Sequence, residues 1–229
     1  MAQGWTIAVW VAIGVLCALA GFCSRRWAEG YAHELAAGAR ANGRTLWRAA
    51  QAATGRPDTR VDILGGALCL GLGIVCLSSG GPDGAGRALA CAALFALAWL
   101  DSRSGLLPDA LTWPLGLSGL LVGPLGVGAA MWAAVLVWSL LAGGARLYRW
   151  CCGHEGFGGG DVKLIMALAI WMGLQPLAWV VLLACLSGLG WAVWMQRSWR
   201  PRGAYPFGPF LALSAIPVLI GWPAVQSWS

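Results

Sequence analysis

Long runs without a charged residue are the feature that most constrains this chain. Twenty consecutive residues from Gly4 to Cys23 carry no charge, which is about the length of helix that crosses the hydrocarbon core of a membrane. Of the 229 residues, 59% are hydrophobic and 10% are charged, whereas charged residues make up about a quarter of a typical globular protein. An ordinary soluble fold is therefore excluded, and we predict an all-α, polytopic integral membrane protein. Further charge-free stretches run over residues 63–79, 88–100, 110–145, 164–196 and 207–229.

Two of these stretches are too long for one membrane span. The stretch 110–145 is interrupted by Gly123-Pro124-Leu125-Gly126, and the stretch 164–196 by Gly173-Leu174-Gln175-Pro176. Glycine and proline clusters of this kind mark turns. Each stretch is therefore predicted to form a helical hairpin, which gives about eight transmembrane helices in a single membrane domain, residues 1–229.

The basic residues indicate the orientation of these spans. If the N-terminus lies outside, eight alternating spans put 14 of the 15 lysines and arginines in inside loops and leave Arg87 outside. Inside loops of membrane proteins carry an excess of such residues. We therefore predict that both termini lie outside in a bacterial inner membrane. The net charge of +6 then reflects topology, not nucleic-acid binding.

Residues 24–60 are predicted to form the only sizeable loop, on the cytoplasmic side. In a helix, Arg40, Arg44 and Arg48 would share one face and dock on anionic lipid headgroups. A solvated basic loop that sets the topology is favoured, because Gly38 and Gly43 weaken a helix.

The eight cysteines indicate neither a disulfide scaffold nor a metal site. Five of them lie inside apolar runs, where cysteine behaves as a small hydrophobic residue. Cys23, Cys151 and Cys152 form no CxxC pair of the kind that binds structural zinc. We expect no metal and no cofactor.

Two aspartates stand out among the acidic residues. Asp101 ends the thirteen-residue run 88–100, which covers about 20 Å of a core about 30 Å thick. This places Asp101 within the membrane boundary, where ionisable residues are usually functional. Asp161 follows Gly158-Gly159-Gly160, and glycines permit the close approach of another chain. A helix-capping role for Asp161 is an equal alternative.

Two carboxylates at helix ends on the same membrane face are typical of the paired acids of aspartic proteases. In that chemistry an ionised carboxylate takes a proton from water, and a protonated one donates to the peptide carbonyl. We expect Asp161, near a helix N-terminus, to be the ionised partner and Asp101, near a helix C-terminus, to be the protonated one.

Three motifs carry a resemblance to a known family. Asp101 is followed by Leu107-Pro108-Asp109, Glu155-Gly156-Phe157 leads into Gly158-Gly159-Gly160-Asp161, and Pro206-Phe207-Gly208-Pro209-Phe210 comes later. In this order they resemble the type IV prepilin peptidases, membrane aspartyl proteases of the GxGD type, and the resemblance runs from about Arg60 to the C-terminus.

The resemblance implies cleavage of the basic leader from type IV prepilin or pseudopilin precursors at the cytoplasmic membrane face, in support of pilus assembly or type II secretion. It implies that Asp101 and Asp161 are catalytic. The three glycines of Gly158-Gly159-Gly160 and Glu155 are expected to contact substrate. Asp109 is expected to be the N-cap of the fourth span, and Lys163 to reach toward lipid headgroups.

Many relatives also methylate the new N-terminus with S-adenosylmethionine and often carry paired CxxC motifs in their first cytoplasmic loop. Residues 24–60 contain no cysteine. We therefore expect a peptidase without zinc and leave methyltransferase activity open.

Other classes of function fit less well. His33-Glu34 and His154-Glu155 lack the second histidine of a HExxH zinc site. Gly116-Leu117-Ser118-Gly119 resembles the GxSG element of rhomboid proteases, but no predicted span contains a histidine to serve as base. A transporter that uses Asp101 and Asp161 as a proton relay, or a non-catalytic assembly scaffold, remain the alternatives.

Overall fold

The computed structural model describes residues 2–38, 43–52, 59–78, 82–153, 158–197 and 206–221. These residues form nine α-helices, and they contain no β-strand. The helices are α1 (Ala2–Ala36), α2 (Gly43–Ala52), α3 (Thr59–Ser78), α4 (Pro82–Ser104), α5 (Asp109–Val122), α6 (Val127–Cys152), α7 (Gly159–Met172), α8 (Leu174–Gln196) and α9 (Gly208–Ile220).

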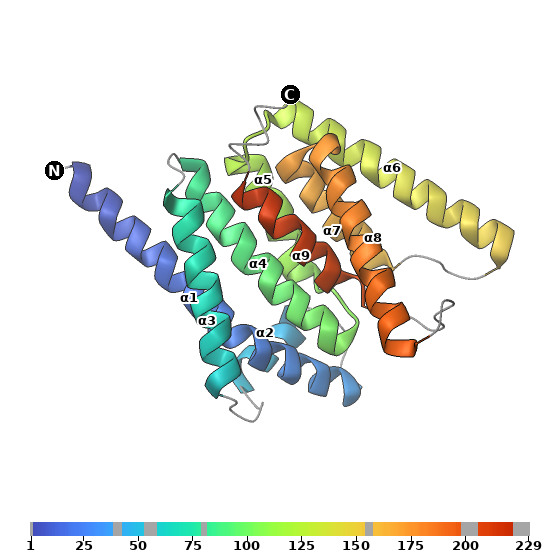
Figure 1. The fold of residues 1–229 in the computed structure, drawn as a ribbon, viewed down its shortest axis with the longest axis horizontal. Helices are drawn as coiled ribbons and strands as arrows, with labels where there is room; N and C mark the ends of the chain where they lie inside the picture. Colours follow the sequence, from blue (N-terminus) through green and yellow to red (C-terminus); the bar gives the residue numbers. More distant parts are fainter. Residues whose placement is uncertain are drawn as a thin grey trace.

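The helices α4, α7 and α9 supply most of the buried core. Leu94 and Leu97 of α4, Leu164 and Leu168 of α7 and Leu211 of α9 are fully buried in one cluster. In Figure 1, α1 and α3 lie together on one flank of α4, α9 lies beside α4, and α8 and α6 lie on the other side. Because apolar side chains on the outer helices stay exposed, the surface that they form suits lipid better than water. Examples are Leu64, Leu68, Leu121, Trp132, Leu140, Trp179 and Leu186.

Among the described residues, five helices are long and apolar enough to cross a membrane, namely α3, α6 and α8 in full, Val11–Ala36 of α1 and Gly84–Ser104 of α4. Helix α9 is apolar but shorter. The predicted all-α membrane fold is therefore confirmed, whereas a count of eight spans is not.

Both predicted hairpin breaks are confirmed. Helix α5 ends at Val122 and α6 begins at Val127, on either side of the first turn. Only Gly173 separates α7 from α8, and its φ of +73° is one that glycine adopts readily.

The first helix does not end where the charge-free run ends. Helix α1 continues beyond Cys23 to Ala36, so residues 24–36 are helical and not part of a loop. Tyr31 in this extension is fully buried against Leu46 of α2 and Leu100 of α4. Tertiary packing therefore stabilises the helical conformation of residues 24–36, although their sequence is polar. Arg44 lies on the short helix α2, and Arg40 lies outside the described residues.

A buried ionic cluster joins α1 to the start of α3. The carboxylate of Asp62 is fully buried and accepts hydrogen bonds from Arg25 Nε at 2.9 Å and Arg26 Nε at 2.9 Å. Arg25 also pairs with Glu29 at 2.8 Å. Because a buried charge that loses its partners is strongly destabilising, this cluster holds the two helices together at one end of the bundle.

Candidate active site

Asp101 lies in the last turn of α4 and is 4% exposed. The helix predicted from the run 88–100 was too short, because α4 begins at Pro82 and includes the buried Arg87. Asp101 nevertheless falls inside the candidate span Gly84–Ser104, as expected. Directly after α4 the chain turns at Gly105, whose φ is +63° and whose N–H donates to the Asp101 carbonyl. This turn leads into Leu106, Leu107 and Pro108.

The Asp101 carboxylate is held by the start of α9. The backbone N–H of Gly208 donates to Asp101 Oδ2 at 2.8 Å, across 107 residues of sequence. Gly208 is the first residue of α9, and the first N–H groups of a helix have no acceptor within that helix. The N–H is therefore available for a side chain from α4.

No side chain fits at Gly208 without a shift. An added Cβ would lie 2.8 Å from Asp101 Oδ2 and 3.0 Å from both Cβ and Cγ of the same residue. The segment from Pro206 to Phe210 was noted in the sequence as typical of the family, but its contact with Asp101 was not anticipated. Only the tertiary structure brings these two motifs together.

Asp161 lies in the first turn of α7, two residues after the helix begins at Gly159. Gly158 is the N-cap residue, with no side-chain cap hydrogen bond, so the capping role considered for Asp161 is not the one observed. Its Oδ2 lies close to Gly158, 3.0 Å from the position of an added Cβ.

The two aspartates are electrostatically coupled. Asp161 precedes the apolar part of α7 and lies outside the five candidate spans. Burial, and secondly the charge of Asp101, raise the pKa of Asp161 to about 6. The negative charge of one carboxylate disfavours the ionisation of a nearby carboxyl, so the two groups titrate as a pair. Asp101 and Asp161, 60 residues apart in the chain, therefore lie near enough for the charge of one to act on the other.

The glycines before Asp161 differ in their surroundings. An added Cβ at Gly160 would lie 3.0 Å from Leu107 Cβ, so this glycine permits the close packing of the Asp101 turn against α7. Gly159 has nothing within 4 Å of such a Cβ, and Gly158 is exposed. Glu155, the fourth expected substrate contact, lies outside the described residues.

Asp109 and Lys163 form an ion pair at the edge of the site. Lys163 Nζ donates to both carboxylate oxygens of Asp109, at 2.7 and 2.8 Å. The N-cap of α5 is Pro108, so the N-cap prediction for Asp109 is wrong. Asp109 is the first helical residue, and its carboxylate is directed to Lys163 instead. Lys163 is thus held by this acid, and its contact with lipid headgroups stays a prediction.

Within the part of the chain that the structure describes, no three His, Cys, Asp or Glu side chains are grouped so that they could hold a metal ion. The chemistry available at this site is that of two carboxyl groups, one of which is buried and bonded to a backbone N–H.

Comparison with known proteins agrees with this arrangement. Residues 88–193 match the type IV leader peptidase family, and they include both Asp101 and Asp161. This part of the chain therefore belongs to that family, as the three motifs indicated. No solved structure matches the chain.

Several relatives carry the name prepilin leader peptidase/N-methyltransferase. The one from Burkholderia pseudomallei is 40% identical over 166 residues, covering 66% of this chain and 50% of its own length. The one from Aeromonas hydrophila is 36% identical over 145 residues (59% and 49%). The one from Dickeya chrysanthemi is 39% identical over 149 residues (59% and 52%). The chain thus matches about half the length of these relatives.

Proposed function

We propose that this chain is an aspartic endopeptidase that removes the basic leader from type IV prepilin or pseudopilin precursors. It would act as a multi-pass protein at the cytoplasmic face of a bacterial inner membrane, in pilus assembly or type II secretion. The proposal is supported by the charge of Asp101 on α4 acting on Asp161 on α7, with both residues inside the segment 88–193 that matches the leader peptidase family.

In the proposed mechanism, ionised Asp161 accepts a proton from a water molecule as the hydroxyl adds to the carbonyl carbon of the scissile peptide. Protonated Asp101 donates its proton to the carbonyl oxygen, which gives a neutral diol intermediate. As the C–N bond breaks, one diol hydroxyl returns its proton to Asp101 and Asp161 protonates the leaving amine. Both acids end in their starting protonation states.

The helix ends at which the two acids lie favour this division of roles. Asp161 lies in the first turn of α7, where the helix dipole stabilises a negative charge, and Asp101 lies in the last turn of α4, where the dipole opposes one. The Gly208 N–H donates to Oδ2 of Asp101, which leaves Oδ1 to carry the proton in the proposed mechanism.

Co-expression of the chain with a tagged prepilin, in cells without a prepilin peptidase of their own, tests the proposal. Mass spectrometry of the prepilin N-terminus should show loss of the leader at a single position. The same spectrum reports methylation, as the added mass of one methyl group on the new N-terminus. A precursor that stays intact beside a well-expressed chain would overturn the proposal.

A further inference from the structure

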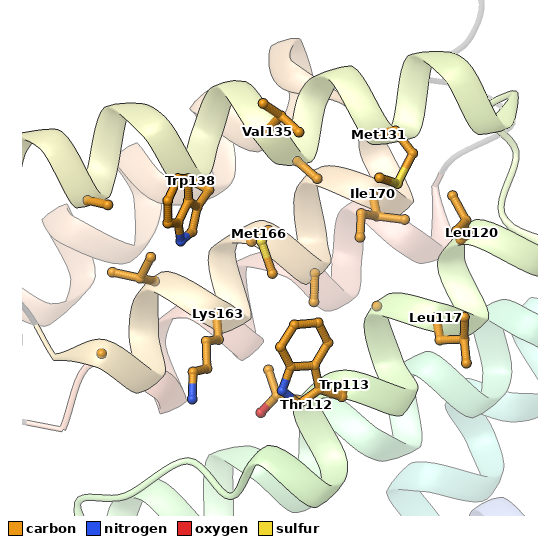
Figure 2. Close-up of a pocket in the computed structure, with 16 residues that line it drawn as sticks. Thr112, Trp113, Leu117, Leu120, Met131, Val135, Trp138, Lys163, Met166 and Ile170 are labelled. Atoms are coloured by element: carbon orange, nitrogen blue, oxygen red, sulfur yellow. The ribbon is translucent and has the colours of Figure 1, made fainter.

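A large apolar cavity lies between α5, α6 and α7. Its volume is about 640 Å³, which is within the range of sites that bind small molecules or parts of larger ones. Figure 2 shows apolar side chains from the three helices around it, among them Leu120 of α5, Met131 of α6 and Met166 and Ile170 of α7. The cavity thus has three helical walls.

The cavity is narrow at one end and open at the other. Residues 123–126 connect α5 directly to α6, so the two helices meet there. The buried residues of α6, from Ala130 to Val137, all belong to its first half, and none from Trp138 to Cys152 is buried. Figure 1 accordingly shows α6 running away from the rest of the bundle toward its C-terminal end. The cavity therefore opens at the end where α6 finishes and α7 begins.

The open end is continuous with the candidate active site. Gly159 lines the cavity and lies in the same helical turn as Asp161. Trp138 and Lys163 flank this end, whereas Leu120 and Met131 lie at the other (Figure 2). An occupant that reaches the open end therefore comes to the turn of α7 that carries Asp161.

The lining indicates what the occupant is. Thr112 and Lys163, its polar side chains, belong to the end near the site, and the rest of the cavity is apolar. From Gly159 to Ile170 the wall of α7 is about 16 Å long, which equals about three turns of helix. An apolar helix that continues into a polar peptide at one end matches both the length and the polarity.

We propose that this cavity binds the first three turns of the apolar helix of the precursor, directly after the cut bond. The proposal rests on the proposed function. Apolar contacts in the groove would hold the helix, and the peptide before it would cross the first turn of α7 between Asp161 and Asp101. The cavity would thereby select substrates by the apolar segment after the cut, independently of the charge of the leader.

Photo-crosslinking tests this placement. A benzophenone amino acid is introduced at Val135, which lines the cavity and is 50% exposed, or at the adjacent Leu136, which is 42% exposed and does not line it. Both proteins carry Asp101→Asn, so that the precursor stays uncut, in vesicles of phosphatidylethanolamine and phosphatidylglycerol. The Val135 probe should form an adduct with the precursor and the Leu136 probe with lipid. Lipid adducts alone from Val135, or equal precursor adducts from both probes, would overturn the inference.

Kinetics of otherwise wild-type variants provide a second readout. Val135→Trp fills part of the cavity and should raise KM about tenfold, since one large apolar contact of the substrate is lost, while Leu136→Trp leaves KM unchanged. Equal KM values in the two variants would contradict the placement.

Cleavage by the wild type is measured first. If the wild type does not cut the precursor, the proposed function fails and this inference fails with it, whereas normal cutting with no effect at Val135 removes this inference alone.

Discussion

Gly208→Ala is expected to impair catalysis through Asp101. The added Cβ would lie 2.8 Å from Asp101 Oδ2 and 3.0 Å from Cβ and Cγ, so either the carboxyl or the start of α9 must move by several tenths of an ångström. Such a shift stretches the hydrogen bond from the Gly208 N–H to Oδ2, now 2.8 Å. A hydrogen bond to a charged group contributes about 1.5–3 kcal/mol. If that contribution is lost in the transition state, kcat falls about 10-fold to 150-fold.

The assay is the kcat and KM of purified protein on a prepilin, together with thermal unfolding in detergent. Gly190→Ala is the matched control, because Gly190 also lies in a helix at the same end of the sequence and an added Cβ there has no neighbour within 4 Å. We expect reduced kcat with little change in KM for Gly208→Ala, and wild-type kinetics for the control. A Gly208→Ala enzyme that unfolds like the wild type and retains its kcat would refute the role assigned to this contact.

Three further outcomes are expected. Asp62→Ala should lower the free energy of unfolding by about 3–5 kcal/mol, because the buried guanidinium of Arg25 and the half-buried one of Arg26 lose the carboxylate that they share. Chemical denaturation measures this, and a loss below about 1 kcal/mol would contradict the buried cluster. Gly119→Ala, whose Cβ would lie 2.7 Å from Trp171 Cδ1, should cost about 1–3 kcal/mol through overpacking, whereas Gly128→Ala, with open space around it, should not. Because Asp161 loses its proton with a pKa of about 6 beside the charge of Asp101, the pair keeps the single proton that the mechanism needs only below about that pH. We therefore expect kcat/KM to fall as pH rises through about 6, and a pH–rate profile flat across that range would contradict the shared site.

The raised pKa also fixes the sign of the stability change with pH. An acid whose pKa is higher in the folded protein than in the unfolded chain binds its proton more tightly when folded. Its contribution to stability is therefore greatest at low pH and declines as pH rises from the ordinary aspartate range through about 6. Thermal unfolding of Asp161→Asn should lack this part of the pH dependence.

The sequence predicted those features that depend on local patterns. Charge-free runs and turn residues located the helices, and the breaks near Gly123 and at Gly173 follow from their chemistry alone. Asp101 was found because an acid at the end of an apolar run is unusual, and Asp161 because it follows three glycines at a predicted helix start. The family of residues 88–193 was evident from three short motifs in order.

Features that depend on tertiary contacts could not be predicted in this way. The extension of α1 to Ala36 relies on the packing of Tyr31 against α2 and α4, which no local pattern reveals. The pairing of Lys163 with Asp109 spans 54 residues of sequence. The sequence showed Gly208 only as part of a motif. The structure explains why a glycine is needed there, because the carboxyl of Asp101 occupies the space that a side chain would fill.

The most direct test of the paired-carboxylate mechanism is the rate at which the purified protein releases the leader. This rate is compared among the wild type, Asp101→Asn and Asp161→Asn. Each substitution keeps the shape of the side chain and removes its acid. Both variants should lose activity by about 10³-fold or more, with no additive loss in the double variant, because residues that act as a unit are not additive. Cleavage at the wild-type rate by either variant would contradict the mechanism.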